Sequence, residues 1–405
     1  MSAARRWLSI IGIGEDGLDG LSPAARRLIS QAALVVGGRR HLALAAGAVN
    51  GDTLAWPSPP QAAFPAILAR RDASVCVLAN GDPFFYGIGS LLAREVPPEE
   101  MICLPGASSF SLAASRLGWA VQDCALVTLH GRPLERIIPH LQPYARILAL
   151  SWDQTTPERL AALLTRFGFG ETRMTVCEAL GGPRERVSAC RADGFVPADT
   201  DPLNLVALEV TAARQGRIVT LAAGLPDTLF EHDGQLTKQD IRAVTLAALA
   251  PRRGELLWDV GAGSGSVGIE WMLACPANRT VAIERNAGRA GRIVRNAAAL
   301  GVPDLSVVEG SAPAVLHSLP RPDAVFVGGG ATIPGTIDAA WAALPSGGRL
   351  VANGVTIETQ AELIGRFRTM GGQLKTIQIA HADPVGGFNA MRPAMPVTQW
   401  SVTKP

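Results

Sequence analysis

The chain has 405 residues and a formal net charge of +2 at pH 7, with 48% hydrophobic and 18% charged residues. This length leaves room for two or three domains of ordinary size, each with its own core. Because the net charge is small and evenly spread, the sequence gives no sign of a nucleic-acid-binding protein or of another protein that binds a polyanion. No run of about eighteen uncharged apolar residues occurs, so we expect no segment that crosses a bilayer.

The six cysteines are Cys76, Cys103, Cys124, Cys177, Cys190 and Cys275. They form no C-x-x-C pair, and most lie in apolar runs, which is typical of reduced core residues in a cytoplasmic protein. No cluster of histidine and cysteine has the spacing of metal ligands, so we expect no metal site.

The first half begins with a predicted strand from Trp7 to Ile13, which leads into a glycine-rich turn. Charged residues end this apolar run too early for a signal peptide. Ser22 then predicts a helix N-cap, with Pro23 at the first helical position and the helix running to about Ser30.

A strand from Ala33 to Val36 leads into a basic turn that contains Arg39, Arg40 and His41. Guanidinium groups at this place can bind carboxylates of a ligand. A solvated loop that begins a helix explains the same residues equally well.

Two later turns have an unusual composition. The strand from Ser74 to Ala79 ends in the loop Asn80 to Gly89, which holds three glycines, three aromatic residues and one acid. Pro105 and Gly106 interrupt another strand, and a helix is predicted from about Phe110 to Leu117. Both turns follow strands, at the sheet edge where ligands bind in open α/β folds.

The segments VGGRRHL (36–42), NGDPFFYGIG (80–89) and PGASSFSLAASRLG (105–118) resemble the tetrapyrrole methylase family, the class III S-adenosylmethionine enzymes of cobalamin biosynthesis. The resemblance covers about Trp7 to Val210. It implies an α/β domain of two lobes, the second of them largely antiparallel.

The same resemblance implies that S-adenosylmethionine lies between the two lobes. The implied cofactor contacts are Gly81, Asp82, Pro83, Ser108 and Ser109. Members of the family often begin with a G-x-G-P-G turn, whereas this chain has Glu15 in the place of the proline. That first turn is therefore left out of the predicted site.

A polar stretch rich in turn formers separates the two halves of the chain. We expect a first domain over residues 1–212, a linker over 213–224 and a second domain over 225–405. In the second domain Thr237 is the predicted N-cap of a helix that ends at Leu249. Asp240 follows three residues later, close to a capping box.

The stretch LLWDVGAGSGSVGIEW (256–271) dominates the second half. A short apolar strand precedes Gly261, Gly263 and Gly265, and a helix follows. Glycines here let a nucleoside lie against the backbone and the first amides of the helix. Glu284 ends the next predicted strand, nineteen residues after Gly265, where its carboxylate can accept from both ribose hydroxyls. The ligand is therefore expected to contain a nucleoside.

The glycine spacing separates two classes of nucleoside-binding enzyme. A dinucleotide fold has G-x-G-x-x-G, and here Ser266 stands in the third glycine position. The pattern G-x-G-x-G with a preceding acid resembles the class I S-adenosylmethionine methyltransferases. A nicotinamide-dependent oxidoreductase that uses Gly261 to Glu284 is the alternative.

Strands and helices alternate regularly in this half. The predicted strands are Leu256 to Trp258, Thr280 to Glu284, Leu305 to Val308, Ala324 to Val327, Arg349 to Asn353, Gln373 to Ala380 and Val397 to Val402. The last two follow each other as in a hairpin. The count predicts a Rossmann-like, mostly parallel sheet of seven strands.

The segments LTKQDIRAVTLAAL (236–249), DVGAGSGSVGIEW (259–271) and AIERN (282–286) resemble a class I family of the cobalamin pathway that methylates C15 of a precorrin and decarboxylates it. The cofactor contacts implied by this resemblance are Thr237, Gly261, Ala262, Gly263, Ser264, Gly265, Glu284 and Ala312. The family often has Asp where this chain has Glu284, and the longer acid still reaches a diol.

The two modules in this order resemble the bifunctional, decarboxylating precorrin C5,15-methyltransferases. The resemblance implies one S-adenosylmethionine site in each domain, with methylation at C5 by the N-terminal domain. It assigns methylation at C15 and loss of the C12 acetate carboxyl group to the C-terminal domain. Relatives of the C-terminal module form tetramers, so a homo-oligomer is also implied.

The substrate of that family carries many carboxylates, which need cationic or hydrogen-bonding partners. The candidates are Arg39, Arg40, His130, Arg132, Lys238, Arg242, His381 and Arg392. For each of them separately, an ordinary surface role is at least an equal alternative. Since the methyl group is already activated, positioning can carry the reaction, and we expect no catalytic triad. In a non-enzyme alternative, one half only senses the cofactor or acts as a scaffold.

Overall fold

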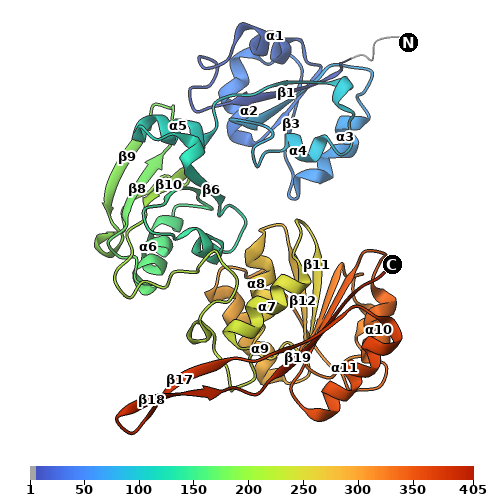
Figure 1. Cartoon of the computed structure of the whole chain (residues 1–405). Coiled ribbons are helices and arrows are strands. Elements are labelled where there is room, and N and C mark those ends of the chain that lie inside the picture. The colour runs from blue at the N-terminus through green and yellow to red at the C-terminus, as the bar shows by residue number, and fades with distance from the viewer. Residues whose placement is uncertain (1–5) are drawn as a thin grey trace. The chain divides into compact units, whose positions relative to one another are not determined.

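The computed structural model describes residues 6–405, so residues 1–5 of the expected first domain lie outside it. The chain forms two compact units. The first runs to Arg132 and also contains Gln142–Arg217, and the second consists of Pro133–Leu141 and Ile218–Pro405. Figure 1 labels many of the elements of both units, which are described separately below.

The first unit opens with a five-stranded sheet in the order β3-β2-β4-β1-β5, in which all neighbouring strands are parallel. Its strands are β1 (Leu8–Ile13), β2 (Leu34–Gly37), β3 (Asp52–Ala55), β4 (Val75–Asn80) and β5 (Met101–Leu104). The accompanying helices are α1 (Pro23–Gln31), α2 (Arg39–Ala45), α3 (Phe64–Leu68), α4 (Gly89–Leu92) and α5 (Ser109–Leu117). Ser22 caps α1 as predicted, since its side chain accepts from the amide of Ala25.

The second sheet of the first unit has five strands in the order β6-β7-β10-β8-β9. The elements of this lobe are β6 (Cys124–Thr128), β7 (Arg146–Leu150), α6 (Thr156–Arg166), β8 (Arg173–Glu178), β9 (Arg186–Arg191) and β10 (Asn204–Glu209). Only β6 and β7 pair in parallel, and the other pairs are antiparallel. The prediction of a largely antiparallel second lobe is confirmed.

The second unit contains a seven-stranded sheet in the order β13-β12-β11-β14-β15-β19-β16. Its strands are β11 (Leu256–Val260), β12 (Arg279–Glu284), β13 (Ser306–Glu309), β14 (Ala324–Val327), β15 (Arg349–Gly354), β16 (Gln373–Ile377) and β19 (Val397–Thr403). Strand β19 runs antiparallel to both neighbours, while the other pairs are parallel. The carboxyl ends of β11, β12 and β14 therefore meet at one edge, where a ligand site is expected.

Helices cover both faces of this sheet. They are α7 (Gln239–Leu249), α8 (Ser266–Ala274), α9 (Ala287–Ala299), α10 (Thr336–Ala343) and α11 (Ile357–Met370). On one face Trp258 and Trp400 share a core cluster with Ile337 of α10 and Leu363 of α11. Every residue of β11 is buried, as the apolar run in the sequence predicted for a central parallel strand.

Short 3-10 helices lie in the connections of both units. They are η1 (Ala46–Ala48), η2 (Pro60–Ala63), η3 (Pro98–Glu100), η4 (Val121–Asp123), η5 (Leu134–His140), η6 (Ala192–Gly194), η7 (Asp227–Leu229) and η8 (Leu316–Ser318). Over residues 6–405, no helix is both long enough and apolar enough to cross a membrane.

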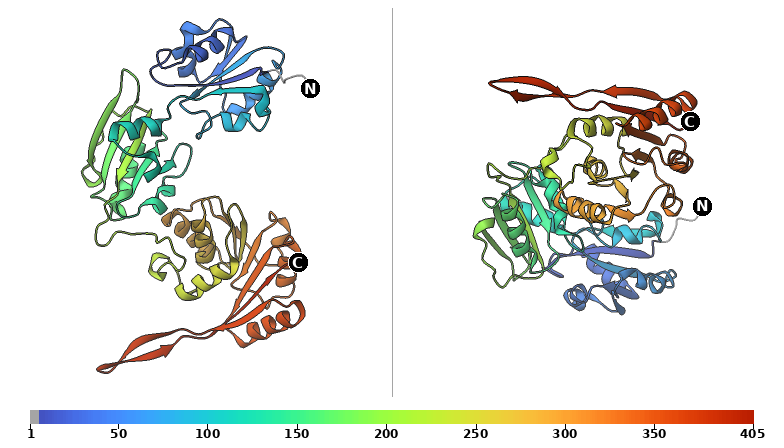
Figure 2. Two further views of the ribbon diagram at one scale, coloured as in Figure 1. Left: turned by 45° about the horizontal axis from the view of Figure 1, so that its top comes forward. Right: turned by 90° about the horizontal axis from the view of Figure 1, so that it is seen from below.

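A two-stranded hairpin extends from the second unit. It consists of β17 (Ala380–Val385) and β18 (Phe388–Pro393), which pair with each other, and it projects away from the sheet in Figures 1 and 2. The predicted strand Gln373 to Ala380 was wrong at its end, because β16 stops at Ile377. The hairpin itself was not predicted, since its prolines and lack of apolar alternation are typical of a loop.

Candidate active site

The turn between β11 and α8 is made of glycines in the left-handed backbone region. The φ angle is +71° at Gly261, +61° at Gly263 and +78° at Gly265. Residues with a Cβ rarely adopt these angles. Space gives a second reason, because a Cβ on Gly261 would lie 2.8 Å from the Cα of Gly329 in the turn after β14. The turn therefore needs the glycines that the sequence provides.

Glu284, the last residue of β12, contacts this turn. Its side chain is buried, Oε2 accepts from the amide of Gly263 at 2.9 Å, and Oε1 accepts from the amide of Asn286 at 3.0 Å. Each carboxylate oxygen has further lone pairs and can still accept from a ligand hydroxyl. Turn and acid together form a polar wall with a fixed geometry.

A cavity of about 350 Å³ lies against this wall. The expected cofactor contacts that line it are Gly261, Gly263, Glu284 and Ala312. Lining residues that were not predicted as contacts include Gln235, Arg285, Arg289, Gly328, Gly329 and Gly330. The three glycines follow β14 at the same sheet edge, so their place directly after a predicted strand is the signal that could have found them.

The remaining expected contacts of this site lie off the cavity wall. Ala262, Ser264 and Gly265 belong to the same turn, and Ser264 is fully buried with no partner for its Oγ among the described residues. Thr237 is half-buried and lies two residues before the start of α7. The predicted N-cap was wrong, because Lys238 holds that position and no side chain caps the helix.

A segment before α7 borders the cavity. The carbonyl of Gln235 lies 2.7 Å from the place of a Cβ on Gly263, so the segment lies directly against the glycine turn. Asp233 pairs with Arg289 at 3.0 Å and with Arg292 at 3.1 Å, both on α9. Hydrogen bonds from these guanidinium groups hold the pKa of Asp233 well below its usual range. The segment is thus fixed to α9 by charge.

Arg242 was expected to bind a substrate carboxylate, and the structure contradicts this. Its side chain is 0% exposed and pairs with Glu270 of α8 and Asp227 of η7. It also donates to the carbonyls of Thr237 and Leu225. A buried guanidinium needs such partners, and here they leave no face open to a ligand.

The other cationic candidates of the second unit are exposed. Lys238 pairs with Asp227 at 3.7 Å and Arg392 with Asp383 at 3.1 Å, and Nε2 of His381 lies 3.8 Å from Oδ2 of Asp240. His381 and Arg392 lie opposite each other on the β17–β18 hairpin. Exposed pairs of this kind exchange partners at little cost, so all three side chains are accessible to a ligand anion.

Behind the first turn of α8, Asp259 is 1% exposed, and its Oδ2 accepts from the amide of Gly268 at 3.0 Å. Burial, and to a lesser degree the charge of Glu284, raise the pKa of Asp259 to about 7. The Asp259 carboxylate thus satisfies a backbone amide in the first turn of α8, and Asp259 does not line the cavity beside Glu284.

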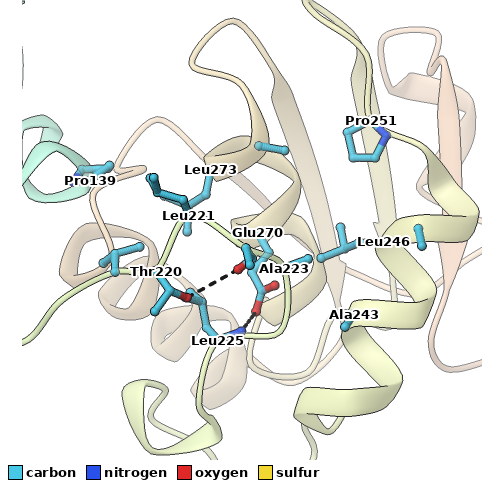
Figure 3. A pocket seen from close by; sticks show the side chains of 14 residues that line it. Pro139, Thr220, Leu221, Ala223, Leu225, Ala243, Leu246, Pro251, Glu270 and Leu273 are labelled. Carbon is cyan, nitrogen blue, oxygen red and sulfur yellow. Dashed lines mark hydrogen bonds between the residues drawn. The ribbon is translucent and has the colours of Figure 1, made fainter. Parts of the chain in front are cut away.

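A second cavity of the second unit, of about 280 Å³, is mostly apolar. Figure 3 shows Leu221, Leu225, Leu246 and Leu273 around it, with the carboxylate of Glu270 accepting from the amide of Leu225. None of the predicted site residues lines it. Because these apolar surroundings solvate a charge poorly, the carboxylate of Glu270 needs Arg242 as a counter-charge.

In the first unit, the end of β1 and the turns after β4 and β5 lie against one another. A Cβ on Gly12 would clash with the carbonyl of Gly81, and a Cβ on Gly81, where φ is +53°, would lie 2.7 Å from the carbonyl of Ala107. Ser108 caps α5 by accepting from the amide of Ser111 at 3.1 Å. The expected contacts around Gly81 and Ser108 thus come together at one sheet edge.

The other expected contacts of the first unit lie in the same two segments. Asp82 and the buried Pro83 follow Gly81, and the Asp82 side chain accepts from the amide of Phe84 at 2.8 Å. Ser109 is the first residue of α5, so its amide points out of a helix N-terminus.

Arg40 forms an ion pair with Glu15, the residue that departs from the family turn. Glu15 also pairs with Arg184 from the loop after β8, at 3.3 Å. The Nη2 of Arg40 lies 2.9 Å from the Nε2 of His41 and 3.4 Å from the Oδ1 of Asn80. Burial and the neighbouring guanidinium lower the pKa of His41 to about 4, so its neutral ring can accept from Arg40. Arg40 is therefore largely occupied by protein partners.

The candidates Arg39, His130 and Arg132 are exposed. Their side chains form no ion pair within residues 6–405, and they are available to a ligand. No group of three or more His, Cys, Asp or Glu side chains that could hold a metal ion occurs in that part of the chain.

Two family models match the chain. Residues 8–194 match the model described as Tetrapyrrole (Corrin/Porphyrin) Methylases, and residues 228–404 match the model described as Precorrin methyltransferase domain.

Known proteins match in whole and in part. A precorrin-6Y C(5,15)-methyltransferase (decarboxylating) of Sinorhizobium sp. is 55% identical over 398 residues, covering 98% of this chain and 96% of the relative. The cobalt-precorrin-7 C(5)-methyltransferase of Salmonella typhimurium (strain LT2) is 32% identical over 200 residues, 46% of this chain and 94% of the relative. The probable cobalt-precorrin-6B C(15)-methyltransferase (decarboxylating) of Saccharolobus solfataricus is 32% identical over 154 residues, 36% of this chain and 77% of the relative.

The α/β folds of both units, the glycine turn beside a buried acid and these matches define an S-adenosylmethionine-dependent methyltransferase. The matches give no support to a nicotinamide-dependent oxidoreductase. More narrowly, the chain belongs to the family of the precorrin-6Y C(5,15)-methyltransferases (decarboxylating), since the identity of 55% extends over nearly its whole length.

Proposed function

We propose that the chain methylates a precorrin of cobalamin biosynthesis twice, at C5 by the first unit and at C15 by the second. The second unit also releases carbon dioxide from the C12 acetate group. Support comes from the shorter relatives, whose names carry a C(5) and a decarboxylating C(15) activity separately. Two different family models along one chain fit such a division, with residues 213–224 as the linker.

The second unit binds S-adenosylmethionine in the cavity beside Glu284, and this geometry is the observation that carries the proposal. The proposed contacts are Thr237, Gly261, Ala262, Gly263, Ser264, Gly265, Glu284 and Ala312. The glycine turn lets the ligand lie against its backbone without Cβ atoms in the way, and Glu284 accepts from the ribose diol. A cavity of about 350 Å³ has the size of a small-molecule site.

The first unit binds a second S-adenosylmethionine at the turns after β4 and β5. The proposed contacts are Gly81, Asp82, Pro83, Ser108 and Ser109. Support comes from the direct contact between Gly81 and the start of α5, where backbone amides and small side chains are close together.

The residues of both units act by positioning. S-adenosylmethionine supplies an activated methyl group, so the protein must align it with an electron-rich carbon of the macrocycle and exclude water. The exposed side chains of Arg39, His130, Arg132, Lys238, His381 and Arg392 hold substrate carboxylates by charge or by hydrogen bonds. Loss of carbon dioxide needs only a desolvated carboxylate next to the conjugated ring as electron sink.

The test is the mass of the product formed by the full chain from a reduced tetrapyrrole and S-adenosylmethionine. A gain of two methyl groups and a loss of one carbon dioxide is expected. A change of only one methyl group, or of none, would reject the proposal.

Matched glycine variants assign each step to a unit. G81V and G263V each place a branched side chain where φ is positive and a carbonyl lies 2.7 Å from the new Cβ. G81V should abolish methylation at C5 alone, and G263V should abolish methylation at C15 and decarboxylation alone. Retained activity of the other unit shows in each case that the effect is confined to the substituted unit. Loss of both methylations in either variant would contradict two separate sites.

We further propose a homo-oligomer, a tetramer by resemblance, that works in the cytoplasm. The six free cysteines suit a reducing compartment. Light scattering of the purified chain measures the assembly, and a particle with the mass of one chain would refute it.

A further inference from the structure

The loop between β4 and α4 carries three consecutive aromatic residues that the proposed cofactor contacts do not use. Phe85 lies inward, with its ring centroid 4.9 Å from that of Phe110. Phe84 and Tyr86 on either side of it are 48% and 53% exposed. Large aromatic side chains that stay half in water call for a partner other than the core.

The backbone of Tyr86 adopts the left-handed region, with φ at +55°. Glycine takes this conformation without steric cost, whereas an aromatic residue is strained there. The loop is folded tightly, because a Cβ on Gly87 would clash with the carbonyl of Pro83 and one on Gly89 would lie 2.8 Å from it. The fold thus forces the left-handed conformation on a residue that is not glycine.

The hydroxyl of Tyr86 adds little stability in return. The hydroxyl donates to the carbonyl of Leu126 only at 3.5 Å, which is a weak hydrogen bond. Strain and exposure alone do not select a functional residue, since Tyr144 has φ at +65° and is 95% exposed. Tyr86 differs from Tyr144 in that its ring is held by other aromatic rings, and in its location.

The ring of Tyr86 is held in place before any ligand arrives. It stacks on Phe85 at 5.2 Å and an interplanar angle of 18°, and it meets Phe110 at 6.2 Å and 55°. Since the stack covers one face of the ring and 53% of the residue is exposed, the other side is open. An aromatic surface that is fixed on one side and open on the other is suited to stacking.

The location of Tyr86 matches this chemistry. The loop begins directly after Gly81, Asp82 and Pro83, the proposed cofactor turn of the same unit. The carbonyl near its hydroxyl belongs to Leu126 on β6, an edge strand of the second sheet, so the ring lies where the two sheets of this unit approach each other.

We propose that the open face of Tyr86, together with the neighbouring Phe84, binds the face of the tetrapyrrole macrocycle in the first unit. A reduced tetrapyrrole offers a broad apolar ring surface with carboxylates at its rim, and aromatic rings fit the former. The contact fixes which carbon of the ring faces the cofactor turn. The inference deepens the proposed function of this unit and rests on it.

The test compares Y86G with Y144G in the full chain, with methylation at C5 and at C15 followed by mass. Y86G removes the ring and relieves the strain, so it is not expected to unfold the loop. We expect the KM for the tetrapyrrole in C5 methylation to rise about tenfold. Affinity for S-adenosylhomocysteine in the first unit and methylation at C15 should stay unchanged. Y86F, which keeps the ring, should restore most of the lost affinity.

The control Y144G relieves the same kind of strain at an exposed tyrosine without ring contacts, and its KM should stay within twofold of the unsubstituted chain. A KM for Y86G within twofold of the unsubstituted chain would overturn the inference while leaving the proposed function intact. Equal weakening of S-adenosylhomocysteine binding would also overturn it, because the loop would then have a structural role. If the unsubstituted chain formed no C5-methylated product, the proposed function would fail first and this inference with it.

Discussion

Arg242 of α7 and Glu270 of α8 form a fully buried ion pair, with the side chains 0% and 3% exposed. The carboxylate of Glu270 also accepts from the amides of Gly224 and Leu225, so it joins both helices to the segment that enters the second unit. Removing one charge leaves the other buried without a partner, which costs far more than the pair itself contributes.

We therefore expect R242M to destabilise the second unit by about 3–5 kcal/mol. R295M serves as control, since Arg295 pairs with Glu231 on the surface and its loss should cost less than about 1 kcal/mol. Urea unfolding with peptide-resolved hydrogen exchange over α7 and α8 measures both. Similar losses for the two variants would show that Glu270 tolerates an unpaired charge.

Substitution of Glu284 by glutamine should weaken cofactor binding in the second unit. Glutamine has an NH₂ group where one carboxylate oxygen now accepts from the amide of Gly263 or Asn286, and the charged acceptor for the ribose is lost. A hydrogen bond to a charged group contributes about 1.5–3 kcal/mol, so the Kd for S-adenosylhomocysteine should rise at least tenfold.

Calorimetry on the full chain resolves this effect from binding in the first unit, which should stay unchanged. E309Q is the matched control, because Glu309 is the register partner of Glu284 on β13, is exposed and does not line the cavity. A Kd for E284Q equal to that of E309Q would argue against ribose recognition by this acid.

Asp259 should make the stability of the second unit depend on pH. Its pKa is raised from 3.8 to about 7, so between these values the folded acid keeps a proton that the unfolded acid loses. Unfolding then releases a proton, and stability falls as the pH rises through this window, by roughly 4 kcal/mol in total. Above pH 7 Asp259 is ionised in both the folded and the unfolded state, so the free energy that its burial costs no longer changes with pH.

D259N removes the titrating group and should flatten this slope, with its largest stabilisation above pH 7. Hydrogen exchange of the β11 and α8 amides at pH 5 and pH 7.5 measures it. An unchanged pH slope in D259N would assign the dependence to other groups.

Glu15 should anchor the loop after β8. The residue is only 9% exposed and pairs with both Arg40 and Arg184. In E15Q Arg40 loses its charged partner and Arg184 keeps only Asp201. We expect amide exchange around Gly182 to accelerate about tenfold, with a lower rate of C5 methylation. E100Q removes a carboxylate that pairs with Arg71 outside this loop, and should leave both readouts unchanged. Equal rates of amide exchange around Gly182 in E15Q and E100Q would show that Glu15 does not anchor the loop after β8.

The sequence predicted best those features that depend on neighbours along the chain. The glycines of the turn after β11 are required by its local backbone, and Glu284 follows at the end of the next strand, so spacing alone brings them together. The same is true of Ser22, whose role as N-cap depends on three residues. Periodicity and spacing carry this information directly.

Features that depend on distant residues were not predictable in the same way. The guanidinium group of Arg242 is of the kind that binds carboxylates of a ligand. That it is instead buried against Glu270 and Asp227 is known only from the folded structure. Gln235 reaches the cavity because Asp233 is paired with arginines more than fifty residues away. Tertiary contacts of this kind leave no periodic signal in the sequence.

The position of β19 has a consequence for how the protein is made. This strand lies between β15 and β16, and its Trp400 is completely buried, so the sheet stays split and its core open to solvent until residues 397–403 have left the ribosome. The first unit, complete by Arg217, can fold while translation continues. For the time needed to synthesise almost half of the polypeptide, the nascent chain thus carries a folded first unit in front of a second unit whose apolar core is still exposed.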